Sequence, residues 1–445
     1  MSMSTSTSTS TRTQSVSVNR RQIVTASVAS VLGWSLDLFD LFVLLYVAPE
    51  VGKLFFPASI PTLSLAAVYA SFAVTLLMRP VGSAIFGSIA DRNGRKRAMT
   101  IAVTGVGIST ALFGALPTIS QIGVTAAILF IILRLIQGVF VGGVVASTHT
   151  IGTESVPPKY RGFMSGLIGG GGAGLGALLA SIVYFAVSAV FPGPEFSVWG
   201  WRFMFFAGIL SSILGLFVFK SLEESPLWVQ LKQSQKEEAK PQKAPLRLVF
   251  SRQYLPVMLV NLMIVTGGGT AYYLTSGYLP TFLKVINKLP AGTSSMILMG
   301  ASVAAIIASM LVGSLSDFIG RKKTFLIMGG ISLVVLPFLY LGMASATTVP
   351  SITAYALALS FLGNAAYAPI LIFLNERFPT AIRSTGTGLS WNMGFAVGGM
   401  MPTFVSLASG ATQNIPLTLT YFAAGVFVLY LIGSLIIPET KGEFN

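Results

Sequence analysis

GSIADRNGRKR at residues 87–97 returns in the second half of the chain as GSLSDFIGRKK at residues 313–323, an offset of 226 residues. A second pair agrees with the first: ESVPPKYR at residues 154–161 returns as ERFPTAIR at residues 376–383, an offset of 222 residues. Two separate motifs that repeat at nearly one offset are typical of an internal duplication. The sequence therefore predicts two structural copies that cross the membrane with the same orientation.

The segments around these motifs are apolar enough to cross a bilayer. Of the 445 residues, 53% are hydrophobic and only 9% are charged, which is too little charge to cover a water-exposed surface. One span takes about 20 mostly apolar residues. On that criterion we expect twelve spans, over residues 23–48, 65–90, 98–117, 122–150, 162–191, 203–220, 254–283, 293–316, 324–344, 350–374, 384–408 and 416–438.

The predicted fold class is an all-α membrane protein with twelve transmembrane helices in two pseudo-symmetric six-helix bundles. We expect the bundles over residues 23–220 and 253–438, joined by a charged cytoplasmic linker over residues 221–252. The Ser/Thr-rich residues 1–22 read as a disordered cytoplasmic tail, and residues 439–445 as a second, short tail.

The basic residues predict the orientation of the chain. The net charge is +14, and most Lys and Arg residues fall in the loops on the side of the two termini. By the positive-inside rule that side is the cytoplasm, and no nucleic-acid partner is needed to explain the charge. Four basic residues fall on the opposite side: Lys53, Arg202, Lys284 and Lys288.

The repeated motifs suit a conformational latch at the cytoplasmic ends of the spans. Glycine lets a neighbouring helix approach, an aspartate can pair with a base or cap a helix, and the second motif adds an acid and a base to the network. The alternative interpretation is a loop that only fixes topology. The predicted gating residues are Gly87, Asp91, Arg95, Glu154, Arg161, Gly313, Asp317, Arg321, Glu376 and Arg383.

Four charged residues fall in the interior of the predicted spans of the first half: Asp37, Asp40, Arg79 and Arg134. Ionisable groups are costly in the hydrocarbon region and are usually functional there. We expect an aspartate, Asp40 before Asp37, to exchange protons while an arginine is freed to hold substrate. The alternative is a static ion-pair network.

The predicted spans of the second half contribute polar and aromatic side chains instead. Each of these alone can serve as packing between helices, as can the single histidine, whereas together they can bind a small solute. A lone histidine and the absence of cysteine make a metal site improbable. The candidate substrate-binding residues are Arg134, Arg79, Trp34, Tyr272, Tyr273, Asn364, Tyr367, Asn392, Asn261 and His149.

Over residues 23–442 the chain resembles the major facilitator superfamily. The paired loop motifs, RLIQG at residues 134–138 and PETKG at residues 438–442 carry the resemblance. LMRPVG around Arg79 and TAYYLTSGYLPTFL at residues 270–283 look like the metabolite:proton symporters, which carry organic acids and compatible solutes. The sialate:proton symporters and the sugar porters are the neighbouring families.

The resemblance implies that Asp40 and Arg134 matter for proton coupling, with Asp37 in place of a glutamate common in the family. The chain departs from many relatives at Val144, where they have an acidic residue, so a coupling role of that acid is absent here. The helix 5 signature of drug antiporters is also missing, which favours symport.

We therefore expect a monomeric transporter of the cell membrane, without a cofactor, that takes up a small organic anion with a proton by alternating access. Uptake of a neutral sugar, a polyol or a zwitterionic compatible solute is the alternative. A nutrient sensor or a channel is more remote, and no constellation of catalytic residues indicates an enzyme.

Overall fold

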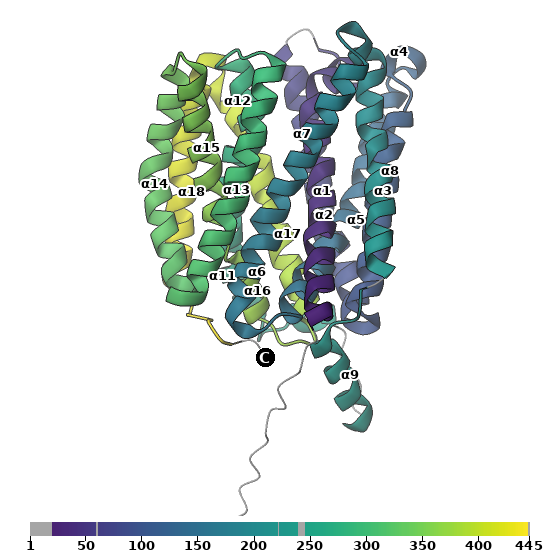
Figure 1. The fold of residues 1–445 in the computed structure, drawn as a ribbon, viewed down its shortest axis with the longest axis vertical. Helices are drawn as coiled ribbons and strands as arrows, with labels where there is room; N and C mark the ends of the chain where they lie inside the picture. Colours follow the sequence, from purple (N-terminus) through teal and green to yellow (C-terminus); the bar gives the residue numbers. More distant parts are fainter. Residues whose placement is uncertain (1–19, 59–60, 221, 239–244, 444–445) are drawn as a thin grey trace, which may run out of the picture.

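A computed structural model describes residues 20–58, 61–220, 222–238 and 245–443 (Figure 1). Residues 1–19 of the tail expected over residues 1–22 lie outside the described residues. Its last three residues correct that prediction, because Arg20 to Gln22 already form the first turn of a helix. Polar residues prolong this helix beyond its apolar stretch, since a helical backbone keeps its hydrogen bonds on leaving the membrane.

The first half of the chain forms six long helical spans, two of which are interrupted by π-helical turns. Its elements are α1 Arg20–Phe55, α2 Pro61–Asn93, α3 Arg95–Ala115, α4 Ile119–Ile122, α5 Thr125–Glu154, η1 Pro158–Tyr160, α6 Arg161–Gly166, η2 Leu167–Gly171, α7 Gly172–Val190, η3 Phe196–Gly200 and α8 Trp201–Lys220. The glycine run on the fifth span begins in η2, where Gly169, Gly170 and Gly171 place no side chain against the wider turn.

The second half repeats this plan after two short helices in the linker. Its elements are α9 Pro226–Glu238, α10 Pro245–Val249, α11 Leu255–Tyr272, η4 Tyr273–Gly277, α12 Leu279–Val285, α13 Ala291–Ile319, α14 Arg321–Ser345, α15 Val349–Ala365, α16 Ile370–Glu376, α17 Arg383–Ser409, η5 Thr412–Asn414 and α18 Ile415–Ile436.

Eleven of the described helical segments are long and apolar enough to cross a membrane. The remaining span is α17, whose 27 residues include many Ser, Thr, Asn and Gly residues. Most of its side chains are buried against other helices, so it needs no apolar surface toward lipid. The twelve-helix bundle confirms the predicted fold class.

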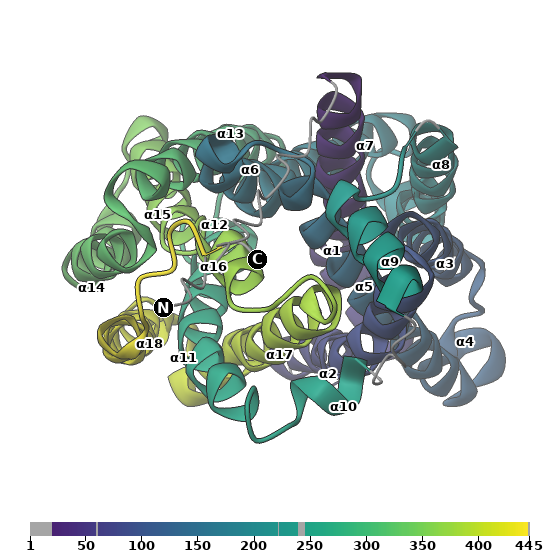
Figure 2. The ribbon, with the colours of Figure 1, turned by 90° about the horizontal axis from the view of Figure 1, so that it is seen from below.

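The two halves stand side by side, with their long helices roughly parallel (Figures 1 and 2). Across the boundary, α17 packs against α2 and α5, and α13 packs against α6 and α7. We call the end that carries α9, the start of α1 and the end of α18 the linker end, and the opposite end the far end.

Glycine allows the closest of these approaches. A methyl group added at Gly166 of α6 would overlap the carbonyl oxygen of Ser309 on α13. The two helices belong to different halves, so the absence of a side chain at this position lets their backbones touch across the boundary.

Candidate functional site

Each half of the molecule caps a helix of the other half at the linker end. Asp91, near the end of α2, accepts hydrogen bonds from the backbone N–H groups of Ser384 (3.3 Å) and Thr385 (3.0 Å) at the start of α17. Asp317, near the end of α13, accepts equivalent bonds from Gly162 (2.9 Å) and Phe163 (3.0 Å) at the start of α6. These N–H groups have no acceptor within their own helix, and the helix dipole favours a negative charge there.

Arginines connect these carboxylates to the second repeated motif. Arg321 pairs with Asp317 and with Glu376, each at 2.9 Å, within the second half. In the first half, Arg95 lies 3.1 Å from Asp91 and 3.4 Å from Glu154. The two halves thus repeat one arrangement of acid, base and acid.

An ion pair crosses the boundary at the linker end. Glu154 accepts a hydrogen bond of 2.8 Å from Arg383. Both side chains are buried, so separating the halves would expose a pair that now neutralises itself.

The structure brings in two further acids that the sequence analysis did not select. Glu224 accepts from the N–H groups of Arg95 (2.9 Å) and Lys96 (3.2 Å), and so caps α3. Glu439 caps α14 in the same way, at 2.8 Å from the N–H of Arg321. The residue after each acid has the same role in both halves. The Ser225 hydroxyl donates a hydrogen bond to Glu154, and the Thr440 hydroxyl donates one to Glu376.

A third sequence repeat could have revealed these residues. Glu-Ser at residues 224–225 returns as Glu-Thr at residues 439–440, an offset of 215 residues. The glycines at the turns also match, because Gly94 and Gly320 have φ angles of 111° and 99°, a conformation that favours glycine.

The remaining predicted gating residues also lie at this boundary. A methyl group on Gly87 would meet the Thr385 backbone at 2.8 Å, and one on Gly313 would overlap the Gly162 carbonyl oxygen. Arg161 begins α6 and lies within electrostatic range of Glu376 and Glu154. The linker end is therefore closed by polar contacts between the halves, and we call this set of contacts the latch.

The four ionisable residues of the first half lie deep in the protein and are paired unevenly. Asp37 and Arg79 approach only to 3.9 Å, a long distance for an ion pair. Asp40 contacts Arg134 indirectly, since the Gln137 amide donates to Asp40 while its oxygen accepts from Arg134 at 2.7 Å. The four residues thus form one direct pair, Asp37 with Arg79, and one pair bridged by an amide, Asp40 with Arg134.

Gln137 is the residue that the sequence analysis missed here. It lies three residues after Arg134 on α5, so the two share a helix face, and its amide also donates to the Thr110 hydroxyl at 3.1 Å. The Arg134 guanidinium stacks over Phe113 at 4.3 Å from the ring centre, which fixes its direction. Arg134 therefore belongs to the interior of the first half.

Aromatic rings of α1, α5 and α17 meet at the boundary between the halves. The centre of the Trp391 ring lies 5.9 Å from that of Trp34, 4.5 Å from that of His149 and 4.6 Å from that of Phe395. Tyr367 continues the group at 6.1 Å from Trp391. Trp34, His149 and Tyr367 were predicted from the sequence, whereas Trp391 and Phe395 were not.

Tyrosines connect this ring group to the buried charges. Tyr272 lies 5.6 Å from Tyr367 and 5.3 Å from Tyr273, between ring centres. Arg79 and Asp37 both act electrostatically on the two tyrosine hydroxyls. We call Trp34, His149, Tyr272, Tyr273, Tyr367, Trp391 and Phe395 the ring group.

Several buried polar atoms in this region lack a hydrogen-bond partner among the residues that the structure describes. Buried polar groups normally have a partner in the protein or in water, so this set indicates a region that binds water or a polar solute. The atoms are the two carboxylate oxygens of Asp37, Arg79 Nε, His149 Nε2, Tyr272 Oη and Trp391 Nε1.

The three candidate asparagines are placed differently from one another. Asn392 donates across the boundary to the Ser83 hydroxyl at 2.6 Å, and Asn364 donates to Ser276 at 2.9 Å. Neither side-chain polar atom of Asn261 has a partner within the described residues. In the same part of the chain, no group of three His, Asp or Glu side chains is arranged to hold a metal ion.

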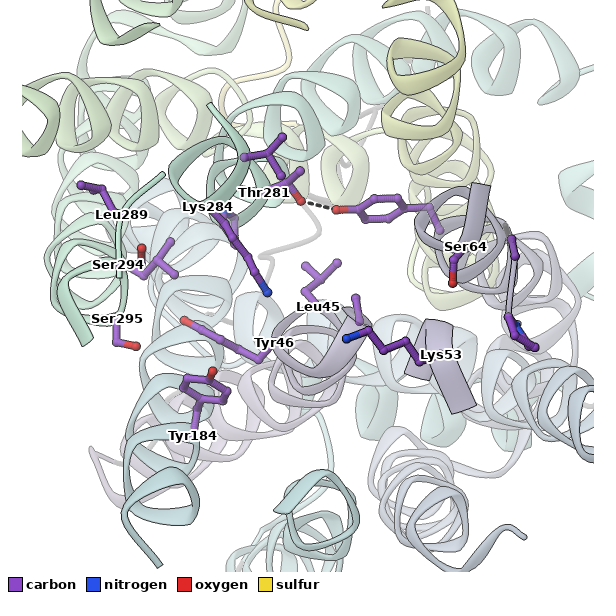
Figure 3. Close-up of a pocket in the computed structure, with 17 residues that line it drawn as sticks. Leu45, Tyr46, Lys53, Ser64, Tyr184, Thr281, Lys284, Leu289, Ser294 and Ser295 are labelled. Carbon is purple, nitrogen blue, oxygen red and sulfur yellow. Dashed lines mark hydrogen bonds between the residues drawn. The ribbon is translucent and has the colours of Figure 1, made fainter. Parts of the chain in front are cut away.

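The far end holds a cavity between the halves, and the Tyr69 and Thr281 hydroxyls bridge it by a hydrogen bond (Figure 3). A cavity of about 440 Å³ lies there between the halves, lined by α1, α2 and α7 on one side and by α12 and α13 on the other (Figure 3). A second cavity of about 20 Å³ lies between Phe42, Tyr272 and Asn364. The structure thus has a wide cavity at the far end and a nearly filled centre.

Comparisons with known proteins agree with this architecture. The model of the Major Facilitator Superfamily matches residues 23–403. The proline/betaine transporter of Escherichia coli (strain K12) is 28% identical over 428 residues, which are 95% of this chain and 84% of that protein. The inner membrane metabolite transport protein YhjE of the same strain is 28% identical over 421 residues, 94% of each chain.

Among solved structures, the proton:xylose symporter XylE bound to 6-bromo-6-deoxy-D-glucose matches with a TM-score of 0.76 and 18% identity, over 95% of this chain and 97% of that chain. At this level of identity the likeness shows the fold alone.

Removing one cap should open the linker end. In Asp91→Asn, α17 loses a charged acceptor, and a charged hydrogen bond contributes about 1.5–3 kcal/mol, so the open population should rise about tenfold or more. The natural chain has no cysteine, so Ser165→Cys, buried at the boundary, reports on opening through its rate of thiol labelling. Labelling should be about tenfold faster in Asp91→Asn.

Glu443→Gln is the matched control, because it removes an exposed carboxylate at the same end. An Asp91→Asn protein that labels no faster than Glu443→Gln would show that the cap does not hold the end closed.

Proposed function

The chain belongs to the major facilitator superfamily and is a multi-pass membrane transporter, and from this premise we propose that it takes up a small zwitterion of the amino-acid or betaine class together with a proton. The linker end, which carries most of the basic residues, faces the cytoplasm in this proposal. Substrate enters from the far end, binds at the centre, and leaves when the latch opens.

The observation that carries this proposal is the ring group beside a loosely paired Asp37 and Arg79. Aromatic faces attract quaternary and secondary ammonium groups, by about 2 kcal/mol or more where water is excluded. Arg79 lies 3.9 Å from Asp37, and its Nε has no partner among the described residues, so it is suited to bind a carboxylate. A zwitterion satisfies both features at once.

The relatives support this choice of substrate over the expected organic anion. The matched E. coli protein is named a proline/betaine transporter, and a relative in Dickeya dadantii, 27% identical, is named for glycine betaine, proline, ectoine and pipecolic acid. These solutes share one carboxylate and one cationic nitrogen. The zwitterionic alternative from the sequence thus becomes the first candidate.

A small organic anion remains the second candidate, because a specific observation favours it. Lys53 and Lys284 both line the far-end cavity, and they attract any carboxylate whether or not it carries a cation.

The proton pathway uses the two aspartates in different roles. Asp37 pairs with Arg79 next to the ring group, and the substrate carboxylate takes its place as the partner of Arg79. Asp40 is linked through Gln137 to Arg134, away from the rings. We assign the coupled proton to Asp40 and the exchange of partners on Arg79 to Asp37.

Loss of a ring should weaken binding of a betaine. Trp391→Leu removes an aromatic face but keeps an apolar side chain, so KM for glycine betaine should rise about tenfold or more, while Trp391→Phe should recover part of the affinity. Uptake of radiolabelled glycine betaine into cells measures both. Trp199→Leu, which removes an exposed tryptophan, should leave KM unchanged.

Competition separates the two candidate substrates. An excess of unlabelled proline should inhibit uptake, while choline, which lacks a carboxylate, and lactate, which lacks a cation, should inhibit weakly. Stronger inhibition by lactate than by any zwitterion would contradict the first candidate and support the second.

Neutralising Asp40 should abolish the coupling of substrate transport to the proton gradient. Asp40→Asn cannot release a proton, so an inward proton gradient should no longer drive accumulation, whereas exchange of labelled for unlabelled substrate should continue. Both are measured in proteoliposomes with and without a pH difference. Asp37→Asn serves as comparison: it removes the charge that competes with the substrate carboxylate for Arg79, so it should mainly lower KM. Accumulation by Asp40→Asn equal to that of the unmodified protein would overturn the assignment.

A further inference from the structure

The far-end cavity is enclosed by both halves of the protein. Lys53 and Tyr46 of α1 and Tyr184 of α7 contribute from the first half, and Lys284 of α12 and Ser295 of α13 contribute from the second. Its volume of about 440 Å³ falls within the range of small-molecule sites. We call this cavity the vestibule.

Two ammonium groups from opposite halves extend into the vestibule (Figure 3). Lys53 and Lys284 belong to the four basic residues that the sequence places away from the linker end. Neither ammonium forms an ion pair within the part of the chain that the structure describes. Both are therefore available to a negatively charged solute that enters from the far end.

One acidic residue lies close enough to influence these lysines. Burial raises the pKa of the Glu50 carboxyl group, and the neighbouring Lys284 and Lys53 act against that rise. With Glu50 ionised, two positive charges face one negative charge, and the net charge of these three groups is +1. The vestibule thus keeps a positive field under either protonation state of Glu50.

The vestibule and the small central cavity share lining residues. Tyr46 and Leu298 line both the vestibule and the small central cavity, which also contacts Tyr272 and Asn364. The Tyr46 hydroxyl lies 2.5 Å from Ser181 Oγ, and its ring stacks on Tyr184 at 5.0 Å. A solute held between the lysines is therefore separated from the central cavity by the side chain of Tyr46.

We propose that the vestibule is a second binding site, in which Lys53 and Lys284 together hold the carboxylate of the solute before it passes Tyr46. The size of the cavity and its apolar residues Leu45, Val285 and Leu289 suit a small organic carboxylate better than a bare inorganic anion. Because each lysine belongs to a different half, the bound carboxylate also draws the halves together at the far end. That this carboxylate belongs to the transported substrate rests on the proposed function, whereas the existence of a carboxylate site in the vestibule does not.

Thiol labelling of the vestibule tests the site directly. Ala58 lines the cavity and is exposed, so Ala58→Cys is the reactive group in an otherwise cysteine-free chain. An anionic methanethiosulfonate should react faster than a cationic one, and the ratio of their rates should fall roughly tenfold in Lys53→Gln/Lys284→Gln. Lys288→Gln, the same change at an exposed lysine outside the cavity, should leave the ratio unchanged.

Protection from labelling shows whether a carboxylate binds. Acetate and glycine betaine should slow the reaction of Ala58→Cys about threefold or more, whereas choline chloride at the same ionic strength should not. The protection should disappear in Lys53→Gln/Lys284→Gln and persist with arginine at both positions. Equal protection by sodium chloride would reduce the site to general anion attraction and overturn the proposal.

A further variant distinguishes binding in the vestibule from binding at the centre. Trp391→Leu weakens binding at the ring group. Protection of Ala58→Cys that remains in the Trp391→Leu protein therefore arises in the vestibule. Protection that disappears in the Trp391→Leu protein arises from closure around the centre and would overturn the proposal. Failure of glycine betaine uptake with intact protection by acetate would instead refute the proposed substrate and leave the vestibule site standing.

Discussion

The structure depends on a requirement of helix geometry: the first N–H groups of a helix need acceptors, and here two helices begin at the buried boundary between the halves. Each half supplies the acceptor for the other, with Asp91 capping α17 and Asp317 capping α6. The two halves can therefore separate at the linker end only if these N–H groups and carboxylates reach other partners. Water entering the opening end is a partner of that kind, so the same contacts can be made and broken repeatedly.

The centre follows the opposite principle, because its polar groups are only partly paired. Asp37 and Arg79 approach to 3.9 Å, and the Tyr272 hydroxyl has no partner in the described residues. A fully paired network would be rigid and would have nothing left to offer a solute. The linker end is thus well paired and the centre is under-paired. In the proposed function, the linker end is the part that moves and the centre is the part that binds substrate.

Much of this arrangement could be predicted from the sequence, and the reason is duplication. The repeats at Asp91 and Asp317 identify the latch, and the position of Arg79 and Asp37 within apolar segments identifies the buried charges. Gln137 was missed because a neutral amide between an acid and a base gives no signal of its own, although its spacing from Arg134 indicates a shared face. Trp391 and Phe395 were missed because the ring group joins residues more than 300 positions apart, such as Trp34 and Trp391, and aromatic residues are common throughout a membrane protein.

The central claim is that one end opens as the other closes, and distances between spin labels on the two halves test it most directly. Asn93 and Lys323 are exposed at the linker end, and Ile122 and Thr347 at the far end, so each pair can be converted to cysteine in a chain that has none. On addition of glycine betaine at acidic pH, the account predicts a longer distance across the linker end together with a shorter one across the far end. Two distances that lengthen or shorten together, or that stay fixed while the labelled proteins transport, would contradict it.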